Sequence, residues 1–192
     1  MQNIYFIDFL ILDFIQSFLK SFVLDPVMQM LSYIGEAGAI WLLAAFIMLF
    51  FRKSRPCAVM LLTSLVLALL IGELGLKNII CRPRPFMVNR DIVLNIKDPT
   101  GYSFPSGHSS CAFASAYVIA RTLKSKAAGI GAYILACLIA FSRLYNYVHF
   151  PTDVLGGIIL GTLCAMATVF VFRKTGLDKK LEREIRIGKK RF

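Results

Sequence analysis

The chain has 192 residues, of which 57% are hydrophobic, and its mean hydropathy is +0.68. This length fits one domain, but the apolar content exceeds the roughly half-apolar composition of soluble domains, so we expect an integral membrane protein. The net charge is +11. Because the basic residues lie in short clusters between apolar runs, without a basic groove carrying exposed aromatic residues, the pattern argues against a nucleic-acid-binding protein.

Residues 1–36 form the first predicted unit, an amphipathic or imperfectly transmembrane segment. Residues 4–24 are apolar except for three charged side chains. These are Asp8, Asp13 and Lys20. Since each charge costs about 2.5–3.5 kcal/mol at the centre of a bilayer, the segment is either one imperfect span or two helices in the membrane interface, and we favour the second interpretation. The start lacks the features of a cleaved secretory signal, so we expect it to be retained.

Residues 37–172 form the predicted membrane core. Five apolar segments here are expected to cross the bilayer as helices, at about 37–51, 56–80, 108–123, 127–141 and 153–172. In the last segment, Gly157, Gly161 and Ala165 recur at every fourth residue, a spacing that lets helices approach closely. The predicted fold class is therefore an all-α integral membrane bundle of five to six spans, the sixth depending on residues 4–34.

The positions of Lys and Arg predict the orientation. Three basic residues follow the first span, three surround the connection between the third and fourth, and nine belong to the basic tail at 173–192, together 15 of the 22. The positive-inside rule places these in the cytoplasm, so the loops at 81–107 and 142–152 are expected outside. We therefore predict a multi-pass plasma-membrane protein with a cytoplasmic C-terminus near anionic head groups.

The first extracytoplasmic loop begins with two cations. Lys77 lies near the outer end of the second span, and Arg84 follows within the sequence Cys81-Arg82-Pro83-Arg84-Pro85. The prolines restrict the backbone and so fix where Arg84 points. Alone, Lys77 is equally compatible with a side chain that merely reaches from the span to the membrane surface.

The only two histidines of the chain, His108 and His149, lie in the two outer loops. Histidine titrates near neutral pH and serves as a nucleophile or as an acid and base. Ser106 and Gly107 directly precede His108 at a helix start, where free backbone N–H groups and the helix dipole favour phosphate. Because both histidines begin a span at the same membrane face, we interpret them as one site rather than as two structural residues.

The second outer loop carries Arg143, His149 and Asp153. Asp153 falls in the first turn of the last span, where the helix dipole favours a carboxylate that can reach back to His149. A carboxylate that accepts one ring N–H fixes the tautomer and leaves the other nitrogen free to attack. An ordinary helix-capping acid needs neither of these partners, so we interpret the three as parts of one functional site rather than as a helix cap.

These segments resemble the type 2 phosphatidic acid phosphatase family, which includes bacterial undecaprenyl pyrophosphate and phosphatidylglycerophosphate phosphatases. The family pattern is K-x6-R-P, P-S-G-H and S-R-x5-H-x3-D. Here the three motifs begin at Lys77, Pro105 and Ser142 and match at every defining position. The resemblance covers about residues 37–172. Soluble haloperoxidases share the motifs, but the pattern of spans argues against that branch.

The resemblance implies a metal-independent lipid phosphate or diphosphate phosphatase with a phosphohistidine intermediate. His149 would attack phosphorus, Asp153 would orient it, and His108 would protonate the leaving oxygen and then activate water. Five further groups would hold the phosphate. These are Lys77, Arg84, Ser106, Gly107 and Arg143. No cofactor is expected, and the acidic residues of the outer loops, Asp91 and Asp98, do not form a metal-binding cluster.

Two other functions remain open on the sequence. A lipid phosphotransferase would use the same histidine intermediate, because a shared motif does not fix the acceptor. A membrane transporter would use Glu73 and Lys77 to line a pathway, although paired broken helices are not evident. Among lipid substrates we favour undecaprenyl pyrophosphate or a broad specificity, with phosphatidylglycerophosphate and phosphatidic acid as alternatives. The sequence does not indicate an oligomeric state.

Overall fold

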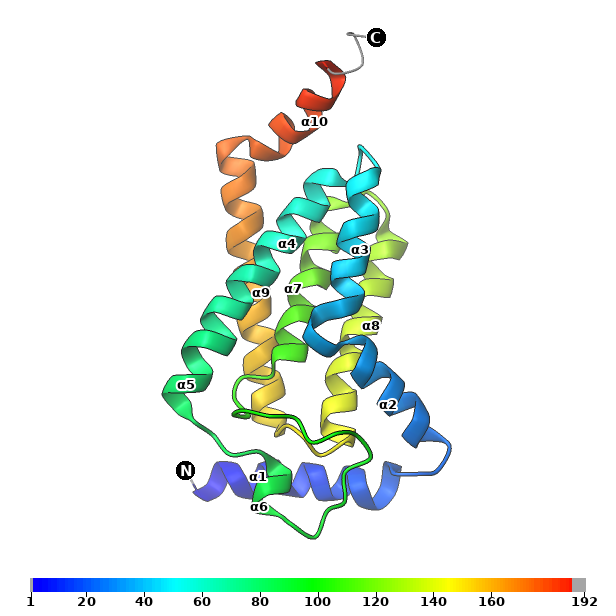
Figure 1. Ribbon diagram of the computed structural model, residues 1–192, viewed down its shortest axis with the longest axis vertical. Coiled ribbons are helices and arrows are strands. Elements are labelled where there is room, and N and C mark those ends of the chain that lie inside the picture. The colour runs from blue at the N-terminus through cyan, green and yellow to red at the C-terminus, as the bar shows by residue number, and fades with distance from the viewer. Residues whose placement is uncertain (1, 188–192) are drawn as a thin grey trace.

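A computed structural model describes residues 2–187, and within them every regular element is helical (Figure 1). Five of these helices run side by side and coincide with the five apolar segments predicted above. They are α3 (Ala39–Phe50), α4 (Arg55–Leu69), α7 (Gly107–Thr122), α8 (Lys126–Tyr145) and α9 (Pro151–Thr175). The predicted all-α bundle is confirmed.

Helix α7 is the centre of this bundle and packs against α4, α8 and α9. Its alanines Ala112, Ala114 and Ala116 are fully buried, so neighbouring helices shield it. In the described part of the chain, three helical segments are long and apolar enough to cross a membrane, at 55–88, 126–145 and 151–175. A fourth results if the bent pair at 24–34 and 36–50 counts as one span. With 16 residues, α7 is shorter than a straight span requires.

Small residues let α7 and α9 approach at backbone distance. A Cβ atom added to Gly157 would lie 2.5 Å from the carbonyl oxygen of Ser106, and one added to Gly161 would lie 2.8 Å from the carbonyl carbon of Ser110. Ala165, one turn further, is fully buried. The predicted role of the small-residue repeat in close helix packing is confirmed.

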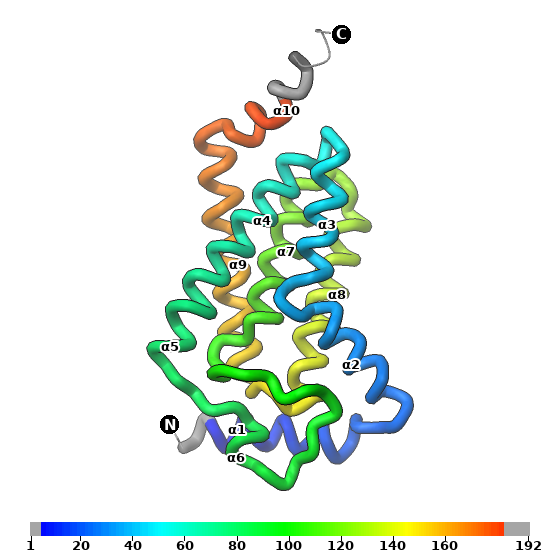
Figure 2. Tube along the Cα trace, in the orientation of Figure 1, coloured from blue at the N-terminus to red at the C-terminus, as the bar shows by residue number. Residues whose placement is uncertain are grey.

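Helix α4 continues through a π-helical turn, η3 (Leu70–Leu76), into α5 (Lys77–Ile80). The chain turns at Cys81, whose φ is 50°, and enters the short α6 (Pro85–Val88). The segment between α6 and α7 then runs across the end of the bundle (Figure 2). This path brings the loop before α7 to the same end as the turn between α8 and α9.

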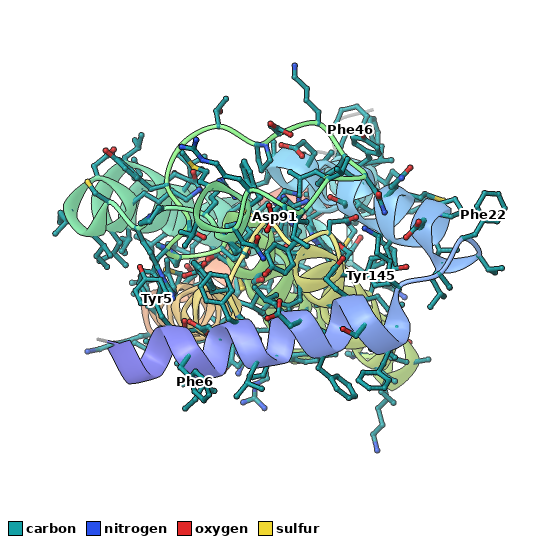
Figure 3. The ribbon with its side chains drawn as sticks, turned by 90° about the horizontal axis from the view of Figure 1, so that it is seen from below. Tyr5, Phe6, Phe22, Phe46, Asp91 and Tyr145 are labelled. Atoms are coloured by element: carbon teal, nitrogen blue, oxygen red, sulfur yellow. The ribbon has the colours of Figure 1, made fainter. Side chains whose placement is uncertain are left out.

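The N-terminal segment forms two helices rather than one straight span. Helix α1 (Gln2–Phe14), extended by η1 (Ile15–Leu19), lies crosswise over the end of the bundle, with Tyr5 on its inner side and Phe6 on its outer side (Figure 3). After an extended residue at Lys20, α2 (Leu24–Ile34) packs against α8 and leads through η2 (Glu36–Gly38) into α3. The segment therefore contains two helices, and their predicted position in the membrane interface stays a prediction.

The charges that argued against a span dock this segment onto the turn between α8 and α9. Asp13 accepts a hydrogen bond from the hydroxyl of Tyr147 at 3.0 Å, and Asp25 accepts one from Tyr145 at 2.8 Å. Asp8 is 1% exposed. Asp8 is therefore buried among protein groups, whereas Asp13 is exposed and Asp25 half-buried, each with a tyrosine hydroxyl as its partner.

Helix α9 ends at Gly176, whose φ of 70° suits glycine, and α10 (Leu177–Ile187) follows. Helix α10 projects from the end of the bundle opposite α1 (Figure 1). The predicted basic tail at 173–192 therefore includes the end of α9 and all of α10, while its last five residues, with Lys189, Lys190 and Arg191, lie outside the described residues.

Candidate active site

A pocket of about 360 Å³ opens at the end of the bundle over which α1 lies. Six of the predicted site residues line it. They are Lys77, Arg84, Gly107, His108, Arg143 and His149. The two other predicted residues, Ser106 and Asp153, are fully buried behind its wall. Residues separated by 72 positions in the sequence thus face one cavity, and both histidines belong to it.

The pocket has a polar end and an apolar side. Ala68, Leu69 and Gly72 of α4 and η3, together with Cys111 of α7, form the apolar lining next to the cationic groups. A site of this form suits a ligand with an anionic head and a hydrocarbon tail.

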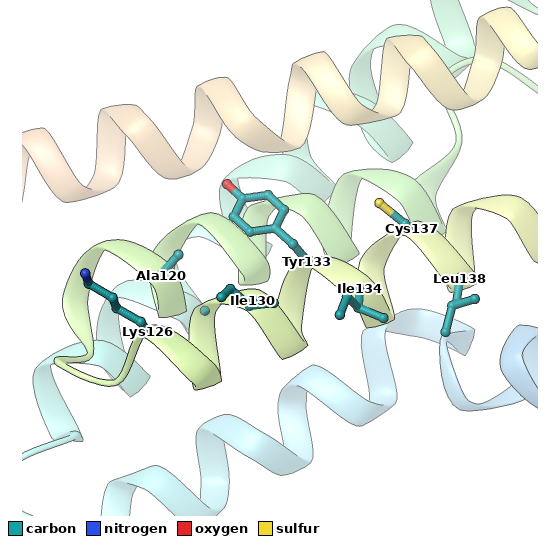
Figure 4. A pocket seen from close by; sticks show the side chains of 8 residues that line it. Ala120, Lys126, Ile130, Tyr133, Ile134, Cys137 and Leu138 are labelled. Carbon is teal, nitrogen blue, oxygen red and sulfur yellow. The ribbon is translucent and has the colours of Figure 1, made fainter.

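A larger groove of about 640 Å³ lies elsewhere, mainly on the outer surface of α8 (Figure 4). Its lining is largely aliphatic and includes Ile130, Ile134 and Leu138, with Tyr133 and Lys126 as polar members. Neither histidine and no carboxylate belongs to it. We therefore place phosphate chemistry in the smaller pocket, where acid–base groups and cations converge.

His149 lies in a buried turn that fixes its tautomer. Its Nε2 atom is 3.2 Å from Nη1 of Arg84, and because a guanidinium only donates hydrogen bonds, Nε2 must be the accepting nitrogen. The hydrogen is then on Nδ1, which lies 3.4 Å from the hydroxyl of Ser103 and 3.7 Å from Oδ2 of Asp153. The lone pair of Nε2 therefore points toward the guanidinium of Arg84, which lines the pocket.

The predicted direct hydrogen bond between His149 and Asp153 is not formed. The separation of 3.7 Å exceeds hydrogen-bond length, because the carboxylate already accepts from Ser103 Oγ and, at 2.8 Å, from the backbone N–H of Phe150. Asp153 thus acts on the imidazole as a nearby charge, with the Ser103 hydroxyl beside both groups.

The surroundings keep His149 neutral. The side chain is 2% exposed, and burial, together with the positive charges of Arg84, Arg143 and Lys77, holds its pKa well below the ordinary value of 6.5. A neutral imidazole with this tautomer keeps Nε2 unprotonated at neutral pH, with its lone pair accepting only from Arg84. This is the state that a nucleophile requires.

Two buried guanidinium groups give the pocket its positive charge. Arg84 is held by backbone carbonyls, with Nε 3.0 Å from Gly101 O and Nη1 3.0 Å from Val148 O. Arg143 donates from Nη1 to the hydroxyl of Ser32. Within the described part of the chain, neither has a carboxylate within ion-pair distance. A buried cation without a counter-charge is costly, so this pair favours an anionic ligand.

Lys77 and the start of α7 complete the polar end. Lys77 forms an ion pair of 2.9 Å with Glu73, which lies one turn earlier on the π-helical segment. The Glu73 carboxylate also packs against the Cα atom of Gly107. An acidic group therefore lies between a lysine and the positive end of a helix, the two elements that also attract phosphate.

Ser106 and His108 take different parts at the start of α7. The hydroxyl of Ser106 accepts from the N–H of Ser109 at 3.4 Å and so caps the helix rather than facing the pocket. Nε2 of His108 lies 3.2 Å from the carbonyl oxygen of Ser32 and 3.6 Å from Glu36. Because a carbonyl only accepts, Nε2 carries the hydrogen and Nδ1 is left as the accepting nitrogen.

Sequence reasoning missed the residues behind His149. Ser103 contacts both His149 and Asp153, and Arg82 forms a 2.5 Å ion pair with Asp153 and a 2.6 Å ion pair with Asp8. The repeated Arg-Pro at 82–85 was the available signal for Arg82. Nothing local distinguishes Ser103, and Asp8 appeared only as a charge in an apolar helix.

Comparison with known proteins identifies the class to which this fold and this site belong. Residues 57–176 match the PAP2 superfamily, which is more than half of the chain. The chain therefore belongs to the PAP2 superfamily.

Two relatives and two solved structures extend this match. An undecaprenyl-diphosphatase of Sulfolobus acidocaldarius is 34% identical over 164 residues, covering 85% of this chain and 77% of that protein. A phosphatidylglycerophosphatase B of Bacillus subtilis is 34% identical over 172 residues, covering 83% and 78%. The crystal structure of a transmembrane PAP2-type phosphatidylglycerolphosphate phosphatase of B. subtilis matches with a TM-score of 0.75 at 29% identity, covering 91% and 88%. Aquifex aeolicus LpxE matches with a TM-score of 0.68 at 28% identity, covering 78% and 87%.

The protein is thus a multi-pass membrane protein and a lipid phosphatase of the PAP2 type.

Proposed function

We propose that the protein hydrolyses a lipid phosphate or diphosphate through a phosphohistidine at His149, without a metal ion. The observation that carries this proposal is the neutral imidazole of His149 beside Arg84 and Arg143, two buried guanidinium groups without a direct carboxylate partner. Such a site attracts a phosphoryl group and presents it to a lone pair.

The first step forms a bond between Nε2 of His149 and phosphorus. The bond from phosphorus to the lipid oxygen breaks, and His108, protonated at Nδ1 when the phosphate is bound, gives that proton to the leaving oxygen. Water then attacks the phosphohistidine, His108 takes a proton from that water, and inorganic phosphate leaves with His149 restored. Asp153, 3.7 Å from Nδ1, offsets the positive charge of the phosphorylated ring.

The cations of the pocket supply the charge stabilisation that this reaction needs. Phosphoryl transfer depends mainly on positioning and on neutralising the equatorial oxygens. Arg84 and Arg143 are fixed by hydrogen bonds to neutral groups, so their charge is available to the phosphate. Lys77 and the N–H groups at the start of α7 add to it. These groups do what a magnesium ion does in other phosphoryl-transfer sites.

The lipid class follows from the form of the pocket and from the relatives. The apolar lining at Ala68, Leu69 and Gly72 provides contact for a hydrocarbon chain next to the phosphate site. Undecaprenyl diphosphate and phosphatidylglycerophosphate are named for two relatives. We favour undecaprenyl diphosphate or a broad specificity among lipid phosphates.

We place the pocket at the extracytoplasmic face. The basic connection between α3 and α4 and the helix α10 lie at the end of the bundle opposite α1 and α6 (Figure 1), so the positive-inside rule orients the pocket outward. Cys81 is exposed and directly follows α5, the helix that begins with the pocket residue Lys77. A membrane-impermeant maleimide should label it in intact cells, with Cys81→Ser as the control. Labelling that requires lysed cells would reverse the orientation.

The activity is tested by release of inorganic phosphate from purified protein, across undecaprenyl diphosphate, phosphatidylglycerophosphate and phosphatidic acid. We expect release from at least one lipid without any added acceptor, and none from a folded His149→Ala variant. Phosphate release only when an acceptor lipid or sugar is added would favour the phosphotransferase. Turnover by His149→Ala equal to that of the wild type would overturn the nucleophile assignment.

A further inference from the structure

A chain of buried charges leads from the N-terminal helix to the residue behind the nucleophile. Asp8 of α1 accepts from Nη2 of Arg82 at 2.6 Å, and Nη1 of the same guanidinium donates to Asp153 at 2.5 Å. Asp8 is 1% exposed, Arg82 9% and Asp153 fully buried. Two carboxylates therefore share one guanidinium outside solvent, where electrostatic interactions are strong.

Asp8 also caps the helix that carries Asp153. Its Oδ1 atom accepts from the backbone N–H of Thr152 at 3.1 Å, and its Oδ2 atom accepts from the Thr152 hydroxyl at 2.6 Å. The residue at the N-cap of α9, Phe150, makes no side-chain hydrogen bond of its own. Asp153 accepts from the N-cap backbone N–H, while the free N–H of Thr152 takes its partner from another helix, which fixes α1 against the first turn of α9.

Aromatic rings confine Arg82 in this arrangement. Its guanidinium carbon lies 4.1 Å from the ring centre of Phe150 and 4.8 Å from that of Tyr5. The ring of Phe150 meets Tyr5 and Phe9 of α1 edge to face, with centres 5.4 Å and 5.2 Å apart. Arg82 therefore has little freedom to turn away if one of its carboxylate partners is removed.

We propose that Asp8 is a positioning residue for the phosphatase reaction, which acts through Arg82 to set the charge and position of Asp153 behind His149. This inference rests on the proposed role of His149. With Asp8 present, the positive charge of Arg82 is shared between two carboxylates, and Asp153 keeps enough negative charge to support the phosphorylated ring. Without it, Arg82 is neutralised by Asp153 alone, and the cation that forms on His149 loses support.

The same helix offers a matched control. Asp13 also lies on α1 and also ties it to the turn that carries the nucleophile, through the hydroxyl of Tyr147 at 3.0 Å. Among the described contacts, Asp13 meets neither Arg82 nor Asp153. Asp13→Asn therefore reports what weaker docking of α1 does, and Asp8→Asn reports docking together with the charge. Asparagine caps helices nearly as well as aspartate, so Asp8→Asn removes mainly the charge.

The experiment measures kcat, KM and the pH profile of full-length protein in detergent with dioctanoyl phosphatidic acid. We expect Asp8→Asn to lower kcat by about 10- to 100-fold with KM changed by less than about threefold, as for the loss of a residue that orients a catalytic group. The acid limb of kcat/KM should move to lower pH, because an under-compensated Arg82 disfavours the protonated imidazole. Asp13→Asn should stay within about threefold in kcat, with an unmoved profile.

A double substitution tests whether the residues act as one chain. In an Arg82→Gln background, Asp8→Asn should cost less than about a further twofold in kcat. If Asp8→Asn does not accumulate as folded protein, Asp8→Glu keeps the charge and should restore folding with kcat above that of Arg82→Gln. Equal kcat losses for Asp8→Asn and Asp13→Asn with unmoved pH profiles, or additive losses with Arg82→Gln, would overturn the inference.

The outcomes separate this inference from the proposed function. If the wild type releases no phosphate from any lipid, or His149→Ala remains active, the proposed function fails. If both behave as proposed and Asp8→Asn matches Asp13→Asn, only the role of Asp8 fails.

Discussion

Replacing Gly157 by alanine separates the two helices that hold the catalytic groups. The added Cβ atom would lie 2.5 Å from the carbonyl oxygen of Ser106 and 2.9 Å from the Cβ atom of Ser109. Ordinary contact begins at 3.4 Å, so α7 and α9 must move apart by about 0.9 Å at this level. The backbone of Ser106 also donates to Asp153 O at 3.0 Å, so this hydrogen bond is strained by the same movement.

The expected cost follows from this overlap. Overpacking of a tight interior costs about 1–3 kcal/mol, and the lower end applies only if the helices relax freely. A displacement of about 1 Å near reacting groups lowers activity by about 100-fold. This applies here because Ser106 begins the helix whose first residues we propose as part of the phosphate site. We therefore expect a lower Tm and a kcat/KM reduced by about two orders of magnitude.

Two other glycines calibrate the measurement. At Gly161, one turn deeper, an added Cβ would meet the backbone of Ser110 at 2.8 Å and 2.9 Å, so Gly161→Ala should lower Tm at least as much. At Gly131, on α8, nothing lies within 4 Å, and Gly131→Ala should leave activity unchanged and raise stability by about 0.5–1 kcal/mol. Thermal unfolding in detergent and phosphate release test all three. Wild-type Tm and activity for Gly157→Ala would refute the close approach of α7 and α9.

Four further predictions concern the pocket. Burial and neighbouring cations hold the pKa of His149 well below 6.5, so this histidine stays neutral on mild acidification. The acid limb of kcat/KM, corrected for substrate ionisation, should therefore lie below pH 6.5. An acid limb above pH 6.5 would contradict the assignment of His149 as the nucleophile. The unfolded chain can protonate this histidine where the folded chain cannot, so stability should also fall as pH drops below about 6.5. Glu73→Gln removes the carboxylate that pairs with Lys77, and the inhibition constant of inorganic phosphate should fall by about three- to tenfold; an unchanged constant would show that Glu73 does not compete with phosphate. EDTA should leave the turnover of purified protein unchanged, and a requirement for added magnesium would count against the metal-free reaction.

The convergence of the pocket residues was predictable from the order of the spans. Alternating spans return every second loop to the same face, so Lys77, His108 and His149 could be assigned to one end of the bundle without knowledge of side-chain geometry. Their hydrogen bonds were less predictable. The spacing of four residues between His149 and Asp153 favours a direct hydrogen bond between them. Instead the hydroxyl of Ser103, 46 positions from His149, donates a hydrogen bond to the Asp153 carboxylate.

The role of the first 36 residues could not be predicted from hydropathy. Hydropathy scales give the free energy of moving each side chain into lipid, so they register Asp8 only as an unfavourable transfer free energy. Its partners Arg82 and Thr152 are 74 and 144 positions away, so no local sequence pattern predicts these contacts. The helix tolerates its carboxylates because they meet protein groups at the end of the bundle, an arrangement that only the three-dimensional structure reveals.

Trapping the phosphoenzyme tests the central claim most directly. Protein mixed with a ³²P-labelled lipid phosphate is quenched in alkaline detergent, where phosphohistidine survives, and the labelled peptide is mapped by mass spectrometry. We predict label on His149 in the wild type, label also in His108→Ala, where formation and hydrolysis of the intermediate are both slowed, and none in His149→Ala. Active enzyme that carries no label in either protein with an intact His149, or that carries it on another residue, would contradict the account.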